Sequence, residues 1–388
     1  MKKKIVILGS TGSIGNTTIE LIKKDKKNFL IKLLSTNKNI KKIYEQAKMF
    51  KVKNVIIKDY NSYIKAKKKY KNSNIIFHNS FSVIDSIFKK KEIFYSMVST
   101  VGTDGLDPSL KLIKYSQNIA IINKEALICG WNLICKRLKK YKTKFFPLDS
   151  EHFSIFSLIG NQSHTNIEKI YITASGGPFL HHSYTSLSKV KIKDALKHPN
   201  WKMGKKISID SSTMMNKLFE VIEAKKIFNI SYKKIKVLIH PKSYVHALVK
   251  FNNGTTKILI HEPKMKIPIH NSIYYYDNRK LKTKELDLKI LNKLDFQKIN
   301  YKKFPLIKIL NTLPKNDSLF ETVLITINDF FVSMYLKKKI NYKKLVYLIN
   351  YYSHYKVFHK FKRKLPKNVD DIYKTKNYVY EKLINSGI

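Results

Sequence analysis

Two carboxylates, Asp149 and Glu151, lie two residues apart at the end of an apolar run, in a chain with only 27 acidic residues against 76 basic ones. In an extended backbone such residues project to the same side, so the two carboxylates would converge. Close carboxylates repel unless a positive group lies between them, and hard oxygen ligands select Mg²⁺ or Mn²⁺. The pair therefore predicts a divalent metal site. The alternatives are a solvated loop or a helix N-terminus, where acidic side chains are also favourable.

A third carboxylate for this site is expected from a helix further along the chain. Glu220 follows Asn216 and Lys217 at helical spacing, and residues three and four apart are neighbours on a helix surface. We predict that Glu220 is the third metal ligand. Glu223 fits an ordinary surface position on the same helix.

Three polar segments supply groups that bind a phosphate monoester. They are TASGGP at 173–178, HPNWKMG at 198–204 and DSSTMMNK at 210–217. Together they offer hydroxyls, glycine amides, an imidazole and an ammonium group. Each segment alone would be ordinary loop or helix-cap chemistry, so the prediction of a phosphorylated substrate depends on all three.

A glycine-rich turn follows the first apolar run of the chain. Gly9, Gly12 and Gly15 of GSTGSIG have the spacing that lets a backbone approach a pyrophosphate at a helix N-terminus. The alternative is a tight strand-to-helix turn without a ligand. The preceding strand, the turn and its terminal position together favour a dinucleotide site.

The end of the second predicted strand indicates which dinucleotide binds. An enzyme that uses NAD ordinarily places an acidic residue there to hold the ribose 2′-hydroxyl. This chain has Asn37, Lys38 and Asn39 instead. A lysine flanked by amides accepts a 2′-phosphate, which an aspartate would repel, so the sequence favours NADPH.

These motifs require elements that position them. Short apolar runs alternate with helix-compatible stretches in the first 150 residues, a rhythm that indicates βαβ units and a parallel sheet. The expected strands are residues 5–8, 30–34, 54–57, 74–77, 95–98, 119–122 and 144–148. The fold class is therefore α/β, with a Rossmann-like, doubly wound parallel sheet at the N-terminus.

The rest of the chain has a different texture. Residues 245–251 and 255–260 flank Asn253-Gly254, which predicts a hairpin in an α+β unit. Ser318 and Glu321 form a capping-box pattern before an apolar helix. We expect four regions: an NADPH-binding domain at 1–148, a catalytic domain at 149–275, a linker at 276–305 and a helical domain at 306–388.

The formal charge of +49 invites a nucleic-acid interpretation. Only three of the basic residues are arginines, however, and Ile, Asn, Tyr and Phe are abundant. Arginine is the usual choice for bidentate contacts to bases and phosphates. Codon bias of an AT-rich genome therefore explains the charge better than selection for specific nucleic-acid binding.

Compartment and membrane association are predicted from composition. The two cysteines, Cys129 and Cys135, are too few for a disulfide framework, which fits a reducing compartment. The first apolar run is too short for a signal peptide, and apolar runs long enough to span a bilayer are absent from the sequence. We predict a cytoplasmic protein without a membrane partner.

In order along the chain, GSTGSIG, NKEAL, PLDSEH, ASGGPF, HPNWKMGKKISIDSSTMMNK and IHPKSYVH closely resemble the 1-deoxy-D-xylulose 5-phosphate reductoisomerase family. The resemblance extends to about residue 270 and continues weakly to the end. It implies a homodimer with an NADPH-binding domain, a catalytic α+β domain and a C-terminal helical domain. It also implies rearrangement of the substrate's carbon skeleton, followed by reduction with NADPH to 2-C-methyl-D-erythritol 4-phosphate.

The resemblance assigns roles to individual residues. The implied metal ligands are Asp149, Glu151 and Glu220, which with Lys124 are also the catalytic residues. Substrate contacts are implied for Lys124, Ser150, Glu151, Ser175, His198, Trp201, Met203, Ser211, Asn216, Lys217 and Glu220, with Trp201 and Met203 on a mobile flap. Cofactor contacts are implied for Gly9, Ser10, Thr11, Gly12, Ser13, Ile14, Gly15, Asn37, Lys38, Asn39, Asn123, Glu125 and Gly204.

Some positions depart from the family pattern. Asn37 stands where glycine is usual, Leu218-Phe219 replaces Gly-Leu, and His261 and Lys264 replace a glycine and an aspartate. Asn328-Asp329 replaces Asn-Glu. Three other interpretations remain open: a dehydrogenase without isomerisation, a nucleic-acid-binding protein on an enzyme scaffold, and a homologue that no longer turns over.

Overall fold

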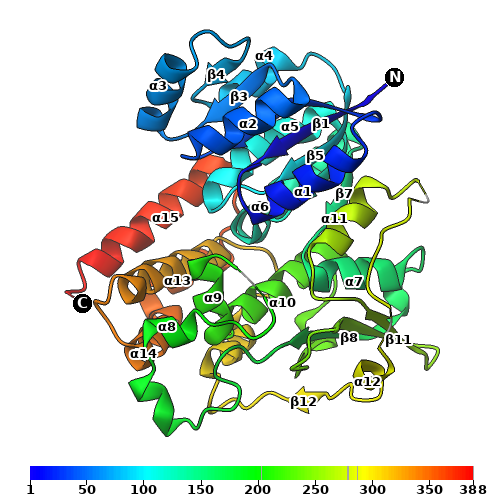
Figure 1. Ribbon diagram of the computed structural model, residues 1–388. Coiled ribbons are helices and arrows are strands. Elements are labelled where there is room, and N and C mark those ends of the chain that lie inside the picture. The colour runs from blue at the N-terminus through cyan, green and yellow to red at the C-terminus, as the bar shows by residue number, and fades with distance from the viewer. Residues whose placement is uncertain (202, 278, 286, 388) are drawn as a thin grey trace. The chain divides into compact units, whose positions relative to one another are not determined.

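Seven parallel strands form one sheet in the N-terminal part of the computed structural model (Figure 1). The structure describes residues 1–201, 203–277, 279–285 and 287–387. The strand order is β4-β3-β2-β1-β5-β6-β7, so the order reverses between β1 and β5, where open α/β sheets bind ligands. The strands are β1 (Lys3–Leu8), β2 (Phe29–Thr36), β3 (Asn54–Ile57), β4 (Ile76–His78), β5 (Ile93–Val98), β6 (Ser116–Ile121) and β7 (Lys144–Pro147).

Helices connect these strands and complete the first of two compact units, Met1–Asp149 with Met265–Leu281. They are α1 (Ser13–Lys24), α2 (Ile40–Phe50), α3 (Tyr60–Lys69), α4 (Ile84–Ile87), α5 (Leu106–Tyr115), α6 (Lys124–Tyr141) and α11 (Lys266–Ile273). Helix α11 packs on α1 although it comes much later in the chain. The buried hydroxyl of Tyr95 is 2.6 Å from that of Ser272, which ties α11 to the sheet.

The second unit, Ser150–Lys264 with Lys282–Ile388, contains a mixed sheet of five strands. Their order is β11-β10-β8-β9-β12. Of the strand pairs described in this second sheet, β8 and β9 run parallel and the others run antiparallel. The strands are β8 (Ile167–Ala174), β9 (Ile235–Ile239), β10 (Val245–Phe251), β11 (Thr256–Ile260) and β12 (Gln297–Lys298). Gly254 adopts φ of +84° in the β10–β11 turn, which glycine tolerates.

Helices α7 and α10 pack beside this sheet and share its apolar core. Ile155 of α7, Ile170 of β8, Val221 of α10 and Val249 of β10 belong to one buried cluster. The helices of the unit are α7 (Ser150–Ile159), α8 (Ile192–Ala195), α9 (Lys205–Ser212), α10 (Met215–Phe228), α12 (Leu288–Leu291), α13 (Phe320–Leu336), α14 (Tyr342–Ser353) and α15 (Val369–Ile384). The core therefore fixes the two helices that carry the candidate site.

A buried ionic group joins α10 to the start of α13. Lys226 Nζ lies 3.1 Å from Glu321 and 2.9 Å from Asp317. Glu321 also accepts hydrogen bonds from the backbone and hydroxyl of Ser318, at 3.1 and 2.6 Å. The predicted Ser318–Glu321 pairing is thus present, and it anchors the helix that carries Glu220.

The fold confirms the α/β class, the seven predicted strands and the predicted hairpin. The predicted domain limits differ from the two compact units. Residues 265–281 pack with the first unit, whereas residues 150–264 and the C-terminal helices form one unit. The segment expected to be a linker, 276–305, contains α12 and also β12, which pairs with β9. Residues 279–285, where the chain passes from the first unit to the second, contain no helix or strand.

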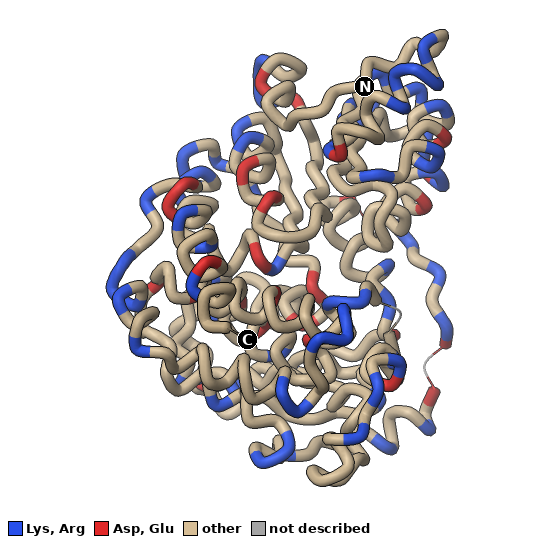
Figure 2. The backbone as a smooth tube through the Cα atoms, turned by 90° about the vertical axis from the view of Figure 1, so that its left-hand side faces the viewer, with Lys and Arg blue, Asp and Glu red and all other residues tan. Residues whose placement is uncertain are grey.

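Basic residues are spread along both units, and acidic residues are interspersed among them (Figure 2). This distribution agrees with a compositional origin of the charge. Among the residues that the structure describes, none of the helices has the length and apolar character needed to cross a membrane.

Candidate functional site

The glycine turn joins β1 to α1 in the first unit. Helix α1 begins after Gly12 without a side-chain cap among the described residues, so its first backbone N–H groups can face an anion. A Cβ on Gly9, whose φ is +78°, would lie 2.6 Å from the Ser99 carbonyl oxygen. A Cβ on Gly15 would lie 2.3 Å from the Gly9 oxygen. The turn therefore fits the pyrophosphate of a dinucleotide.

Substitution of Gly15 tests this packing. Gly15→Ala is expected to lower the free energy of unfolding by about 1–3 kcal/mol, because the added methyl group meets backbone that cannot move away. Gly12→Ala is the matched control, because its Cβ meets only the Gly9 oxygen at 3.4 Å. Guanidinium unfolding followed by circular dichroism measures both variants. Equal stability of the two would contradict the close approach at Gly15.

The side chains of Ser10 and Thr11 in the turn contact other residues of the first unit. The Ser10 hydroxyl donates to Gln46 Oε1 at 2.7 Å, and Gln46 Nε2 donates to the Ser10 carbonyl at 3.0 Å. Thr11 Oγ1 lies 2.6 Å from Thr36 Oγ1. Ser10 is fully buried, so it would contact a cofactor through its backbone. Ser13 and Ile14 form the first turn of α1.

Two residues that follow β2 have different environments: Asn39 caps the next helix, and Lys38 is exposed. The Asn39 side chain accepts a hydrogen bond from Lys42 N at 3.1 Å and so begins α2. Lys38 keeps 72% of its side chain exposed, with Nζ 3.7 Å from Asp59. Asp59 is the N-cap of α3 and accepts hydrogen bonds from Ser62 in the first turn of that helix. These hydrogen bonds hold the pKa of Asp59 below its usual value, and Lys38 has a smaller effect. Asp59 thus interacts mainly with its own helix, and Lys38 remains accessible to a phosphate next to Asn37.

The NKEAL motif begins α6. Asn123 accepts from Ala126 N at 2.8 Å and donates to the Thr100 and Gly102 carbonyls, each at 2.6 Å. Its side chain therefore holds the loop after β5 in place. Glu125 is buried in the first turn of α6. Lys124, the first residue of α6, forms an ion pair with Asp149, the last residue of the first unit.

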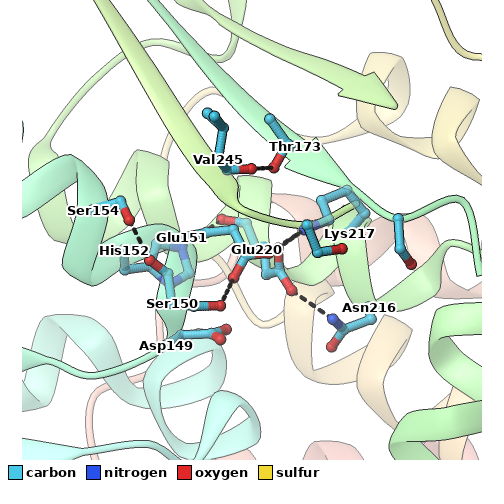
Figure 3. Close-up of polar contacts among 12 residues, drawn as sticks. Asp149, Ser150, Glu151, His152, Ser154, Thr173, Asn216, Lys217, Glu220 and Val245 are labelled. Atoms are coloured by element: carbon cyan, nitrogen blue, oxygen red, sulfur yellow. Dashed lines mark hydrogen bonds and ion pairs between the residues drawn. The ribbon is translucent and has the colours of Figure 1, made fainter. Parts of the chain in front are cut away.

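In the second unit, Glu151 and Glu220 converge on one ammonium group (Figure 3). Lys217 Nζ lies 2.8 Å from Glu151 Oε1 and also pairs with Glu220. Carboxylate oxygens of the two glutamates lie within 4.8 Å of one another. Asn216 donates to Glu220, and the Ser150 hydroxyl donates to Glu151 at 2.6 Å. The predicted helical grouping of Asn216, Lys217 and Glu220 is confirmed.

The backbone around Asp149 and Glu151 differs from the prediction. Helix α7 begins at Ser150, so Glu151 lies in a first helical turn and not on an extended segment. An acidic residue there is favoured by the helix dipole. The alternative of a helix N-terminus is therefore realised, but the carboxylate still faces Lys217 from α10.

The electrostatics of this cluster are strongly coupled. Burial alone would raise the pKa of Glu151, but the charge of Lys217 and the hydrogen bonds from Lys217 and Ser150 hold it well below its usual value. Burial likewise opposes the charge of Lys217, but Glu151 and Glu220 raise its pKa. Both groups are therefore ionised near neutral pH. Buried carboxylate oxygens around one positive charge are the donor set that suits Mg²⁺ or Mn²⁺.

His152 contacts Glu220 and Glu223 beside the carboxylate cluster. Neither His152 nor Glu223 was predicted to have a role in the site. His152 Nε2 donates to the Glu220 carbonyl at 2.9 Å, and its Nδ1 lies 3.9 Å from Glu223 Oε2. Both side chains are buried. The interpretation of Glu223 as a surface glutamate is wrong, because its face of α10 packs towards α7. Its spacing of three residues from Glu220 was the available signal.

The predicted phosphate segments meet at His198. Its Nδ1 accepts from the backbone N–H groups of Asn200 at 3.2 Å and Trp201 at 3.0 Å. Its Nε2 therefore carries the proton and donates to Ser175 Oγ at 3.1 Å. Burial and then Lys217 lower the pKa of His198 to about 4, so the imidazole is neutral at pH 7.

The other predicted contacts lie close along the chain. Gly204 is the N-cap of α9, and a Cβ there would meet nothing within 4 Å. Ser211 lies on α9, half-buried. Trp201 and Met203 are half-buried and flank Lys202, which lies outside the described residues.

Comparisons with known proteins cover most of the chain. Family models match at residues 5–130 (1-deoxy-D-xylulose 5-phosphate reductoisomerase), 145–228 (its C-terminal domain) and 260–381 (DXP reductoisomerase C-terminal domain). A reductoisomerase of that name from Pelagibacter ubique (strain HTCC1062) is 53% identical over 387 residues, covering 100% of both chains. One from Clostridium kluyveri is 36% identical, covering 89% of this chain and 91% of the relative.

Solved structures agree with these relatives. DOX-P reductoisomerase in complex with NADPH, fosmidomycin and magnesium has a TM-score of 0.90 at 28% identity, covering 98% of this chain and 97% of the other. The reductoisomerase from Zymomonas mobilis in complex with NADPH has a TM-score of 0.86 at 27% identity, with the same coverage.

Proposed function

Because this chain belongs to the 1-deoxy-D-xylulose 5-phosphate reductoisomerase family, we propose that the carboxylates and the glycine turn described above carry that family's reaction. The protein is an NADP-dependent oxidoreductase. It converts 1-deoxy-D-xylulose 5-phosphate to 2-C-methyl-D-erythritol 4-phosphate with NADPH and a divalent metal, in isoprenoid precursor synthesis.

The convergence of Glu151 and Glu220 on Lys217 is the observation that carries the assignment of the metal site. These two glutamates and Asp149, which directly precedes α7, would hold Mg²⁺ or Mn²⁺. When bound, the metal supplies Lewis-acid polarisation of a substrate oxygen. His152 fixes the backbone of Glu220 and so orients this ligand.

Other side chains would bind and orient the substrate. Lys124 and Ser150 are assigned to substrate hydroxyl groups. The neutral His198 donates to Ser175 Oγ, which leaves the Ser175 hydroxyl proton free to donate to a phosphate oxygen. Asn216, Lys217 and Ser211 add donors. Trp201 and Met203 would cover the substrate and exclude water from it.

The cofactor is assigned to the turn between β1 and α1. The uncapped N-terminus of α1 would bind the pyrophosphate, and Lys38 would bind the 2′-phosphate. NADPH supplies the hydride. Gly12 contributes by leaving room for the cofactor, and Asn123 by holding the neighbouring loop.

We also propose a cytoplasmic homodimer, in line with the resemblance and the low cysteine content. The proposed partner is a small phosphorylated sugar; the structure of a relative with fosmidomycin supports this class of ligand. Multi-angle light scattering tests the dimer: a mass of twice 45.5 kDa is expected, and a mass of 45.5 kDa would exclude it.

The overall function is tested by NADPH oxidation on addition of 1-deoxy-D-xylulose 5-phosphate. Oxidation is expected with Mg²⁺ or Mn²⁺ and is expected to stop with a chelator, because the carboxylates alone do not polarise the substrate. NMR of the product should show the rearranged skeleton. A reduced but unrearranged product would support a simple dehydrogenase, and absence of oxidation with either metal would refute the proposed function.

A further inference from the structure

Two imidazole rings stack on each other inside the second unit. His246 lies on β10, and His261 directly follows β11; their centroids are 4.1 Å apart, and their planes differ by 22°. Trp201 packs edge-on against His246 at 6.1 Å, and Phe153 packs edge-on against His261 at 5.9 Å. The hairpin and two aromatic neighbours therefore hold both rings in place.

Hydrogen bonds determine which nitrogen of each ring carries the proton. His261 Nδ1 lies 2.7 Å from the Glu262 carbonyl, so Nδ1 donates and Nε2 keeps its lone pair. His246 also hydrogen-bonds the backbone of His261. Burial lowers the pKa of His246 to about 3 and also lowers that of His261, so both rings are neutral. Each ring has one nitrogen that can accept a hydrogen bond.

Both accepting atoms lack a hydrogen-bond partner in the part of the chain that the structure describes. The Nε2 atoms of His246 and His261 are buried, and neither has a hydrogen-bond partner among the described residues. Leaving a buried polar atom unpaired costs free energy comparable to a lost hydrogen bond. A ligand that brings a donor to these atoms would recover that free energy.

The location indicates the ligand. Glu151 interacts electrostatically with both rings, and Lys217 with His246, so the pair adjoins the carboxylate cluster. Trp201, assigned to the substrate, packs against His246 of this pair. An anion or a carbonyl oxygen could not donate to the two Nε2 atoms, whereas hydroxyl groups could, each with one hydrogen bond.

We propose that His246 and His261 form an acceptor pair for hydroxyl groups of the substrate, which makes His261 a specificity-determining residue. The proposal rests on the proposed function, because it takes a hydroxylated sugar phosphate as the ligand. His261 is one of the positions that depart from the family pattern. The second acceptor is therefore a property of this chain's own sequence.

His261→Phe tests the pair, because phenylalanine keeps an aromatic ring for stacking and removes the acceptor. The dissociation constant of 1-deoxy-D-xylulose 5-phosphate, measured by tryptophan fluorescence without NADPH, is expected to rise about tenfold, or about 1.4 kcal/mol. KM should rise in parallel, with kcat within about twofold. His261→Gln, whose amide oxygen accepts, should recover part of the affinity.

His270→Phe is the matched control, because His270 is a buried histidine that packs on Tyr274 in the first unit. It should leave the dissociation constant unchanged. Unchanged affinity in His261→Phe would overturn the acceptor pair, while metal-dependent turnover of the wild type would still support the proposed function. If bound water alone satisfied the two nitrogens, His261→Phe would change thermal stability and not affinity, which would also overturn the proposal.

Discussion

Glu220→Gln is expected to lower kcat/KM for 1-deoxy-D-xylulose 5-phosphate by about a thousandfold or more. Glutamine keeps the shape of the side chain and its contact with Asn216, but it removes the negative charge that pairs with Lys217 and would bind the metal. Lewis-acid stabilisation by a bound metal is worth several kcal/mol, and each 1.36 kcal/mol changes a rate tenfold. Initial rates of NADPH oxidation over a range of Mn²⁺ concentrations measure the effect.

Glu168→Gln is the control for this substitution. Glu168 pairs with Lys250 on the surface of the same unit, with both side chains more than a third exposed. Its change to glutamine should leave kcat/KM within about twofold. Activity of Glu220→Gln close to that of the control would show that Glu220 is not a metal ligand.

The N-terminal sheet was predictable because its signal is local. Each strand of a doubly wound sheet is an apolar run followed by a helix, and this alternation can be counted along the chain. β1 and the glycine turn after it also occur in one continuous segment, GSTGSIG. The nucleotide turn could therefore be predicted without knowing any contact between distant residues.

The start of α7 was harder to predict. Strand β7 ends at Pro147, shortly before α7 begins at Ser150, and periodicity does not show where an extended run ends and a helix begins. The prediction of converging carboxylates used an extended backbone at Asp149 and Glu151. Glu151 faces Lys217 for another reason: α7 and α10 pack against the same sheet and share one core.

Contacts between distant segments account for what the sequence did not predict. The buried position of Glu223 depends on α7 lying against its face of α10, and the stacking of His246 on His261 depends on the register of the β10–β11 hairpin. The return of residues 265–281 to the first unit depends on α11 packing on α1. Local propensity contains no information about these pairings.

Lys217→Met is expected to lower the free energy of unfolding by about 3–5 kcal/mol, because it removes the ammonium group that pairs with two buried carboxylates. Carboxylate oxygens of Glu151 and Glu220 lie within 4.8 Å of each other, and Lys217 pairs with both in the second unit. Methionine fills a similar volume without charge. Urea unfolding at neutral pH without divalent metal measures the loss. Lys250→Met, which removes half of an exposed ion pair, should cost less than about 1 kcal/mol.

The difference in the free energy of unfolding between wild type and Lys217→Met should depend on pH in a defined direction. The pKa of Glu151 is lowered from 4.5 and that of Lys217 is raised from 10.5, so the stabilisation from the pair should be present between these pH values. It is lost as acid protonates Glu151 and as base deprotonates Lys217. The stability gap between wild type and Lys217→Met should therefore narrow below about pH 4.5 and again above about pH 10.5.

Divalent metal should restore part of the stability that Lys217→Met loses. A ligand that binds only the folded state at 100 times its dissociation constant adds about 2.7 kcal/mol. In wild type, the Lys217 ammonium already pairs with Glu151 and Glu220, so the metal competes with it. Thermal melts with and without Mg²⁺ should give a larger shift in Lys217→Met than in wild type. Equal shifts would mean that the metal and Lys217 do not compete for these carboxylates.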